Sequence, residues 1–300
     1  MPNPRRTHLD GLAIGLMAVC CAAWALQQIL IKAAIGELAP IWQASLRFIG
    51  STILLLIWCR IRGVRIFVRD ASLKAGMLAG LLFTLEFVCI YLAMRDTSAA
   101  RVTVFLYSAP FVLALLLPWF VPQERVRPLQ WVGLSLAFAA LAVAFGDALL
   151  TPTGPRQWIG DTLAVGSGIF WALTTLVIRV SVLSRITAEK MLLYQVGLTA
   201  LLLPCVSIVF GEQWSLTMTS LAWISLAYQI LIGSFITLLM WMWMLQRYPA
   251  TGLSAFSFLT PLLTLVFSVS FLGEPLTLSL VAALLGVSAG IVLVNRRTGR

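Results

Sequence analysis

Ten runs of apolar residues, each long enough to cross a lipid bilayer, constrain this chain more than any other feature. Their approximate limits are 10–35, 40–59, 72–94, 98–120, 128–147, 158–180, 187–211, 219–245, 251–272 and 276–295. About 20 helical residues cross the ~30 Å hydrocarbon layer, because an α-helix rises 1.5 Å per residue. The gaps are short and carry Pro or Gly, as at 36–40, 122–128, 152–155 and 273–275. The chain is therefore predicted to be an all-α membrane protein with ten transmembrane helices, and neighbouring helices are predicted to run antiparallel.

The charge of the chain fits a membrane protein better than a nucleic-acid-binding one. Of its 300 residues 60% are hydrophobic and 11% are charged, whereas roughly 25% of the residues in a soluble domain are charged. The net charge of +10 could indicate nucleic acid, but the charges cluster in the gaps between the apolar runs. That pattern sets orientation in the lipid bilayer. We expect no nucleic-acid partner.

The distribution of Lys and Arg predicts the orientation. Most of the 21 basic residues fall in segments on the side of the N-terminus. The segments on the other side hold four: Lys32, Arg95, Arg101 and Arg156. Since basic segments stay in the cytoplasm, both termini are predicted to be cytoplasmic. The first run follows Arg5 and Arg6 as in a signal peptide, but it is too long for one and is predicted to be a retained span in a multi-pass inner-membrane protein.

The second half of the chain repeats the first. Trp24 in the first run is matched by Trp171 in the sixth, 147 residues later. The fourth and ninth runs match at a spacing of 151: Ala99/Ala250, Phe105/Phe256 and Pro110/Pro261. Five spans per half is an odd number, so the halves, 1–150 and 151–300, are predicted to cross the membrane in opposite senses. Such inverted repeats commonly place a substrate site near the membrane midplane, between the halves.

Paired prolines mark the centre of this repeat. Pro110 and Pro261 end two related heptapeptides, Val104–Pro110 and Ala255–Pro261, inside apolar runs. A proline removes one backbone hydrogen bond and bends a helix, and lipid cannot repair that loss. Each bend, whether a hinge or a fixed kink, is therefore expected to face protein or a wet cavity. Tyr107 and Phe258, three residues earlier, are expected to lie near the bends and the cavity.

Two tryptophans near the middle of their helices are candidates for gripping a substrate. One turn after Trp24 come Gln27 and Gln28, and Thr175 follows Trp171 at the same distance. An indole beside amides or hydroxyls could hold a ring and satisfy its polar ends, although tryptophan in a bundle is often simple core. The two glutamines lie about 100° apart, so one of them is expected to pack elsewhere.

Glu86 is the acid that lies well inside a span, and Phe83 shares its helix face. A carboxylate in lipid is expensive and normally faces the bundle interior or a partner. It could be a counter-charge for a substrate ammonium or a proton site, or it could form a structural pair with Arg47 at the same depth. At the 151 spacing, Thr237 matches Glu86, and Trp241 follows one turn later. These positions complete the predicted binding residues.

The ten spans, the inverted halves and the paired proline motifs resemble the drug/metabolite transporter superfamily, specifically its EamA-type exporters. Within it, the stretches Leu81–Cys89 and Phe258–Pro261 look like those of bacterial inner-membrane exporters of aromatic amino acids. The resemblance implies broad amino-acid export, with some cationic drugs as further substrates. It also implies that the fifth and tenth helices brace the bundle while the other eight surround the cavity.

The sequence therefore predicts an inner-membrane exporter of aromatic and other hydrophobic amino acids that works by alternating access. The alternative is an exporter that exchanges protons at Glu86 for lipophilic cations. A membrane-embedded lipid enzyme or a sensor is a third hypothesis. It lacks support because the single histidine is in the N-terminal tail and no catalytic set, Walker motif or metal-ligand spacing is present. No cofactor or metal is expected, and the five cysteines are expected to be small packing residues.

Overall fold

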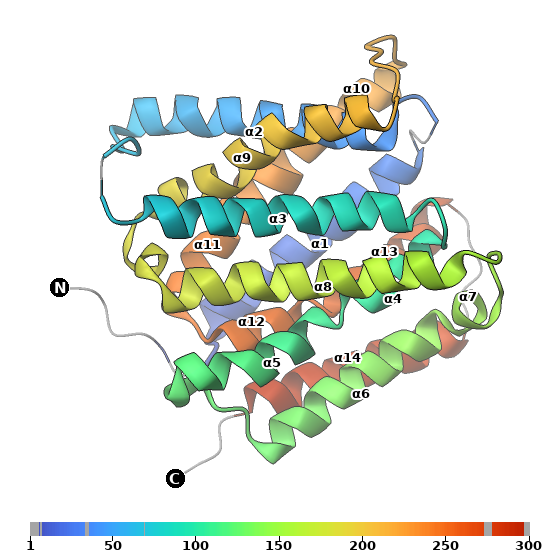
Figure 1. Ribbon diagram of the computed structural model, residues 1–300. Helices are drawn as coiled ribbons and strands as arrows, with labels where there is room; N and C mark the ends of the chain where they lie inside the picture. Colours follow the sequence, from blue (N-terminus) through green and yellow to red (C-terminus); the bar gives the residue numbers. More distant parts are fainter. Residues whose placement is uncertain (1–5, 7, 34–35, 69, 273–277, 297–300) are drawn as a thin grey trace.

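A computed structural model describes residues 6, 8–33, 36–68, 70–272 and 278–296, and all the regular structure in these ranges is helical (Figure 1). The α-helices of the first half are α1 (Gly11–Ala33), α2 (Pro40–Arg62), α3 (Leu73–Ala93), α4 (Ala99–Leu106), α5 (Ala109–Phe120), α6 (Pro128–Ala144) and α7 (Gly146–Leu150). Those of the second half are α8 (Gln157–Val180), α9 (Ala188–Val209), α10 (Ser220–Tyr228), α11 (Thr237–Arg247), α12 (Ala250–Phe256), α13 (Leu259–Leu272) and α14 (Leu278–Asn295). Short 3₁₀ turns occur at η1 (Pro122–Glu124) and η2 (Val182–Arg185), and η3 (Gln229–Ile236) is π-helical. The expected connection at 273–275 and Arg5 lie outside the described residues.

Within the described residues, nine segments are long and apolar enough to cross a membrane. They coincide with nine of the ten apolar runs, with ends that differ by a few residues. The run at 128–147 differs, because it forms the 17-residue helix α6 and then breaks at Phe145 before the short α7. At 1.5 Å per residue, α6 is about 25 Å long, which is shorter than a typical span.

Three of the nine segments depart from a regular α-helix. The fourth run breaks at Tyr107 and Ser108 between α4 and α5, and the ninth breaks at Ser257 and Phe258 between α12 and α13. Both breaks lie just ahead of the paired prolines, because a proline near the start of a helix needs no hydrogen-bond acceptor one turn earlier. The eighth run is continuous but widens into the π-helical η3.

Local sequence signals fix several helix ends. Pro40 occupies the first turn of α2, and Gly63 ends that helix with a left-handed φ of 66°. Thr187 and Thr219 accept hydrogen bonds from backbone N–H groups in the first turns of α9 and α10. Glu37, in the α1–α2 connection, is hydrogen-bonded to the start of α10. The backbone N–H and hydroxyl of Thr219 donate to the Glu37 carboxylate, both at 2.7 Å, and these bonds lower the pKa of Glu37.

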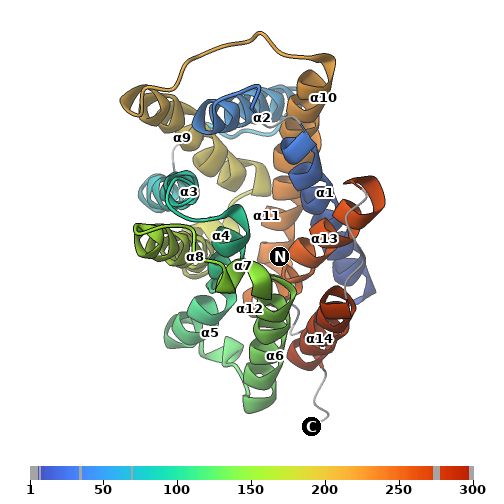
Figure 2. The same ribbon diagram turned by 90° about the vertical axis from the view of Figure 1, so that its right-hand side faces the viewer.

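Helices from the two halves interleave. α3 lies between α8 and α9, α2 packs on α9, α1 packs on α13, and α6 packs along α14. Figure 1 shows α3 and α8 side by side across the front of the molecule and α6 beside α14 at its lower edge. Figure 2 looks along the bundle and shows α1, α10 and α13 on one side of the centre and α3, α8 and α9 on the other. The centre is therefore walled by helices from both halves.

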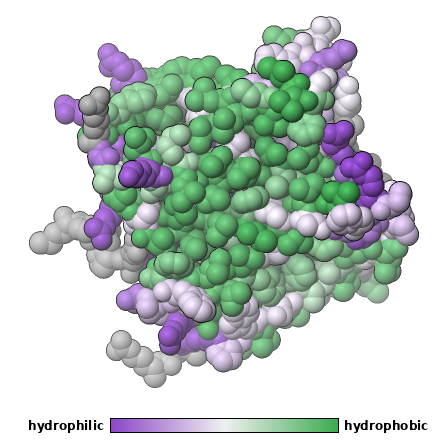
Figure 3. Space-filling view, in the orientation of Figure 1, coloured by the Kyte–Doolittle hydropathy of each residue, from purple (hydrophilic) through white to green (hydrophobic). Residues whose placement is uncertain are grey.

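The molecule has two ends, which we name by the chain. At the N-terminal end, Leu9 beside α1 and Asn295 at the close of α14 both lie against Gly252. The opposite end carries the α1–α2 and α3–α4 connections. Between the two ends, the face in Figure 3 is covered by apolar side chains, whereas hydrophilic residues gather at its edges. Exposed Met77, Leu78 and Leu81 of α3 belong to this apolar surface, which suits contact with lipid chains.

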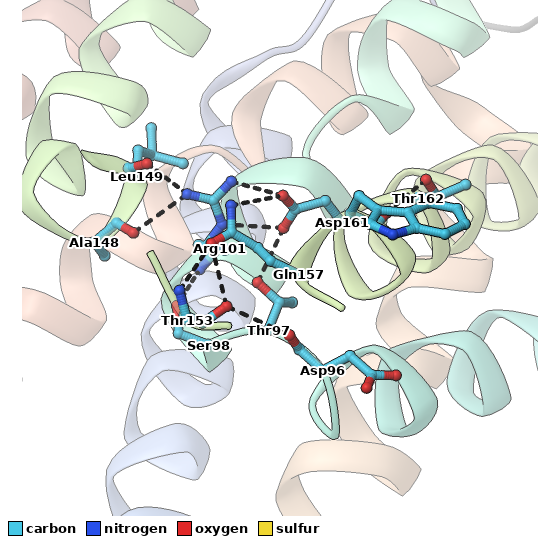
Figure 4. Close-up of polar contacts among 11 residues, drawn as sticks. Asp96, Thr97, Ser98, Arg101, Ala148, Leu149, Thr153, Gln157, Asp161 and Thr162 are labelled. Atoms are coloured by element: carbon cyan, nitrogen blue, oxygen red, sulfur yellow. Dashed lines mark hydrogen bonds and ion pairs between the residues drawn. The ribbon is translucent and has the colours of Figure 1, made fainter. Parts of the chain in front are cut away.

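A buried ion pair ties α4 to α8 at the opposite end (Figure 4). Arg101 donates from Nε to Asp161 Oδ1 at 3.0 Å and from Nη2 to Oδ2 at 2.6 Å. Its Nη1 donates to the backbone carbonyl of Leu149 in α7, and the Thr97 hydroxyl donates to Asp161 Oδ1 at 2.9 Å. Arg101 of α4 thus binds both α8 and α7, and this contact fixes the three helices against one another.

Candidate functional site: a central aromatic cavity

A cavity of about 540 Å³ lies at the centre of the bundle. Its walls come from α1, α2, α3, α4, α8, α9, η3 and α11, with Ser257 from the break before α13 and Thr260 from the first turn of α13. Eight aromatic residues face it: Trp24, Phe48, Phe83, Phe87, Tyr91, Tyr107, Trp171 and Trp241. A mostly apolar hollow with a few polar groups is typical of a small-molecule site.

The structure brings most of the predicted binding residues together. Those that line the cavity are Trp24, Gln27, Gln28, Phe83, Glu86, Tyr107, Trp171, Thr175 and Trp241. Thr237 and Phe258 lie behind the lining, each in contact with a residue that does line it. The Trp24 indole N–H donates to the Thr237 hydroxyl at 2.8 Å, and the Phe258 ring lies 5.4 Å from that of Tyr107. Their role in binding remains a prediction.

Two aromatic pairs shape the cavity. The rings of Trp24 and Trp241 meet edge to face at 6.1 Å and join α1 to α11. Tyr107, at the α4–α5 break, meets Trp171 of α8 edge to face at 5.8 Å. Edge-to-face pairs of this kind fix ring orientation, because the positive ring edge of one residue meets the negative face of the other. The cavity therefore offers fixed indole surfaces on helices of both halves.

Gln27 and Gln28 both contribute to the lining, so the expectation that one packs elsewhere is wrong. The side chain of Gln28 is exposed. Gln27 is 8% exposed, and its Oε1 has no hydrogen-bond partner among the described residues. Gln27 lies so close to Gly233 of the π-helical η3 that a side chain at 233 would overlap its Oε1. Since π-helical segments often occur at functional sites, η3 is a further element of the site that the sequence did not indicate.

Glu86 and Arg47 are both deeply buried, with 7% and 5% of their surfaces exposed, and both line the cavity. No ion pair joins them in the described part of the chain, so the structural pair considered from the sequence is absent there. The Arg47 guanidinium instead lies over the rings of Phe48 and Phe87, at 4.5 and 5.0 Å from their centroids. Arg47 was missing from the predicted binding residues, because the sequence presented it only as a partner for Glu86.

The N-terminal end is linked by charged contacts between the halves. Arg179 of α8 donates from Nε to Glu124 Oε1 at 2.6 Å and from Nη1 to the Leu245 carbonyl at 2.6 Å. Glu124 Oε2 in turn accepts from the Ala250 N–H at 3.0 Å. The cavity lining includes none of these residues, whereas it reaches Leu38 and the exposed Met94 at the opposite end.

A second link at this end joins the α2–α3 connection to α9. Lys190 Nζ donates to Asp70 Oδ2 and to the Val68 carbonyl, both at 2.7 Å. Together with hydrogen bonds from Ser72, this ammonium lowers the pKa of Asp70 to about 2. The carboxylate therefore stays charged at any physiological pH, and the link persists.

A larger hollow of about 910 Å³ lies at the N-terminal end and contains none of the predicted binding residues. Basic side chains dominate its lining: Arg6, His8, Arg125, Arg127, Arg179 and Arg296. We regard the central cavity as the candidate site, because it holds most of the predicted binding residues and its two charged side chains, Arg47 and Glu86, are buried. The described ranges hold no cluster of His, Cys, Asp and Glu suited to a metal ion, and all five cysteines are free thiols.

Comparison with known proteins gives a consistent result. The model of the EamA-like transporter family matches residues 11–146 and again 158–296. An uncharacterized transporter of Bacillus subtilis, YvbV, is 27% identical over 94% of this chain and 91% of its own length. A probable terminal-alkyne amino-acid exporter of Streptantibioticus cattleyicolor is 31% identical over 67% of this chain and 65% of its own.

One solved structure supports the fold. A protein of known crystal structure superposes on 96% of this chain and 100% of its own, with a TM-score of 0.82. Its sequence is 17% identical, so the likeness concerns the fold alone.

Proposed function

The chain belongs to the EamA-like transporter family, and we propose that it exports aromatic and other hydrophobic amino acids across the inner membrane by alternating access. The observation that carries this proposal is the central cavity, with its fixed indole rings and its buried Glu86. The rings offer an apolar side chain a surface to pack on, and the carboxylate offers an ammonium its counter-charge. The amino-acid exporter of Streptantibioticus cattleyicolor adds support for this substrate class.

The proposed architecture is ten spans in two inverted halves, 1–150 and 151–300. The two matches of the family model, one on each side of residue 150, support a duplicated chain. In this arrangement the short helix α6 is the fifth span, and it packs along α14, the tenth. The bias of Lys and Arg supports cytoplasmic termini, which makes the N-terminal end the inner end.

In the proposed transport step, the cavity opens alternately toward the inner and the outer side of the membrane. The contacts of Arg179 and of Lys190 hold the inner end together, while the cavity lining reaches the opposite, outer end. To load substrate from the cytoplasm these inner contacts must open. The breaks ahead of Pro110 and Pro261 provide places where α4 and α12 can move relative to α5 and α13.

Reconstitution into liposomes tests the proposal. We expect purified protein to carry radiolabelled phenylalanine across the membrane faster than empty vesicles do, and Glu86→Ala to reduce that rate at least tenfold. Folded protein that moves no labelled amino acid would exclude amino-acid export. The control is Arg95→Gln, an exposed side chain outside the cavity lining, which is expected to transport normally.

The second candidate function is exchange of protons for lipophilic cations. It is favoured by one observation, the Glu86 Oε2 atom, which is buried and has no hydrogen-bond partner among the described residues. A carboxyl group in that position could carry a proton. The mark of this function would be cation uptake that follows an imposed pH gradient and disappears in Glu86→Gln.

A further inference from the structure

Two opposite charges, on Arg47 and Glu86, line the central cavity, and neither forms an ion pair within the described part of the chain. Arg47 Nε and Nη2 and Glu86 Oε2 are buried, and none of them has a hydrogen-bond partner among the described residues. The chain treats its other buried cations differently. Arg101 is paired with Asp161, Arg179 with Glu124, and Lys190 with Asp70. The cavity is therefore the place where the described chain leaves a buried cation and a buried anion unpaired.

Leaving such charges unpaired opposes folding, because a buried ion loses its hydration without gaining a partner. A ligand that carries both charges would repay that loss at both groups. A ligand with only one charge would leave the other buried group without a partner and without hydration. The two residues therefore select for a ligand that has an anionic and a cationic group close together.

The orientation of Arg47 indicates which of its atoms meets the ligand. The faces of the guanidinium are covered by the rings of Phe48 and Phe87. Its buried Nε and Nη2 atoms have no hydrogen-bond partner among the described residues, and these two atoms form the edge that binds a carboxylate through two parallel hydrogen bonds. Phe87, one of these two rings, directly follows Glu86 in α3.

We propose that Arg47 binds the α-carboxylate and Glu86 the α-ammonium of a free amino acid, so that the substrate class is the zwitterion and not the lipophilic cation. This inference rests on the proposed function and narrows it. The aromatic lining, including Trp24, Trp171 and Trp241, then receives the side chain of the substrate. Amines without a carboxylate are rejected because they leave Arg47 buried and unpaired.

Binding of three related ligands to the purified full-length protein tests the proposal. Quenching of tryptophan fluorescence reports occupancy, since three indoles line the cavity. The ligands are phenylalanine, phenethylamine, which lacks the carboxylate, and 3-phenylpropionate, which lacks the amine. We expect the wild type to bind phenylalanine roughly 10- to 100-fold more tightly than either analogue, since a hydrogen bond to a charged group is worth about that factor.

Variants assign the two roles. In Arg47→Gln the advantage of phenylalanine over phenethylamine should fall to about one, while its advantage over phenylpropionate persists. Glu86→Gln should show the reverse, and Arg47→Lys should retain part of the preference because it keeps the charge. Arg95→Gln is the matched control. Its guanidinium also lies over a ring, that of Phe210, but it is exposed and outside the cavity lining, so all three affinities should be unchanged.

The outcomes separate this inference from the proposed function. Equal binding of phenylalanine and phenethylamine by the wild type would overturn the inference, and so would an equal loss of all three ligands in Arg47→Gln. The wild-type comparison needs no variant, so it holds even if Arg47→Gln fails to fold. If the binding preference stands but vesicles transport nothing, the proposed export is wrong and the zwitterion site remains.

Discussion

At the scale of single residues, the molecule holds its helices together with a small number of buried charged contacts. Arg101 is the clearest case, since its guanidinium is 7% exposed and meets Asp161 through two hydrogen bonds. A second arginine–aspartate pair lies at the same end. Arg156 meets Asp96 at 3.1 Å, but its side chain is 69% exposed. The two pairs share their chemistry and differ in burial.

Replacing Arg101 with glutamine should therefore destabilise the protein far more than replacing Arg156. Removing one partner of a buried pair leaves an uncompensated charge and costs about 3–5 kcal/mol, whereas an exposed pair contributes about 0–1 kcal/mol. Thermal unfolding of the two variants in detergent measures the difference. Equal melting temperatures for Arg101→Gln and Arg156→Gln would show that the buried pair does not hold α4 to α8.

The residues of the site could be predicted only in part. Trp24 and Trp171 stand out in the sequence because they lie at matching places in the two halves, and Glu86 stands out because an acid is rare inside an apolar run. All three line the cavity. Arg47 was not assigned to the site, and the pairing of Asp161 with Arg101 was not foreseen. A sequence shows how deep a charge lies along its helix, but its partner belongs to another helix and depends on tertiary packing.

At the scale of elements, small residues decide how closely helices approach. Gly286 and Gly290 form a GxxxG pattern in α14, which fits close helix contact. The structure places that face against α6, where a Cβ atom at Gly290 would lie 2.6 Å from the carbonyl oxygen of Gly133. The pattern is thus used within the chain. The sequence indicated a close contact but could not name the helix that makes it. It gave no sign of the π-helical η3 either, which packs against α2 and accepts a hydrogen bond from Ser51 at the Ile230 carbonyl.

Gly290→Ala should separate α6 from α14 and lower stability, because the new methyl group meets backbone atoms that cannot move aside. Overpacking of this kind costs about 1–3 kcal/mol. Gly15→Ala in α1 is the matched control, since nothing lies within 4 Å of its added Cβ atom. It should leave the melting temperature unchanged or raise it, since alanine favours a helix by up to about 1 kcal/mol over glycine. A loss in Gly15→Ala equal to that in Gly290→Ala would contradict the close contact.

At the scale of the whole molecule, the positions of the long apolar helices were the most predictable features. Long apolar runs leave the backbone few alternatives in lipid, so nine segments appear where the sequence placed them. The cavity was harder to predict, because its walls come from nine elements spread over both halves of the chain. The paired prolines pointed to the centre of the bundle, yet the breaks fall ahead of them.

The proposed orientation predicts which surfaces meet the outside of the cell. Met94→Cys, at the rim of the cavity, should react with a membrane-impermeant maleimide in intact cells. Gln123→Cys, in the exposed turn η1 at the N-terminal end, should react only after the membrane is opened. Both variants are made with Cys89 and Cys205 changed to serine, since these are the thiols that are not fully buried. Labelling of Gln123→Cys in intact cells would reverse the orientation.

The packing of α14 along α6 also bears on how the protein is made. α6 leaves the ribosome long before α14, so its small residues Gly133, Ala137 and Ala140 stay without their protein neighbour until α14 has been made. Packing of the two helices in the membrane therefore waits for α14. A premature stop codon shortly before Leu278 would leave that face of α6 uncovered and mark the product for degradation.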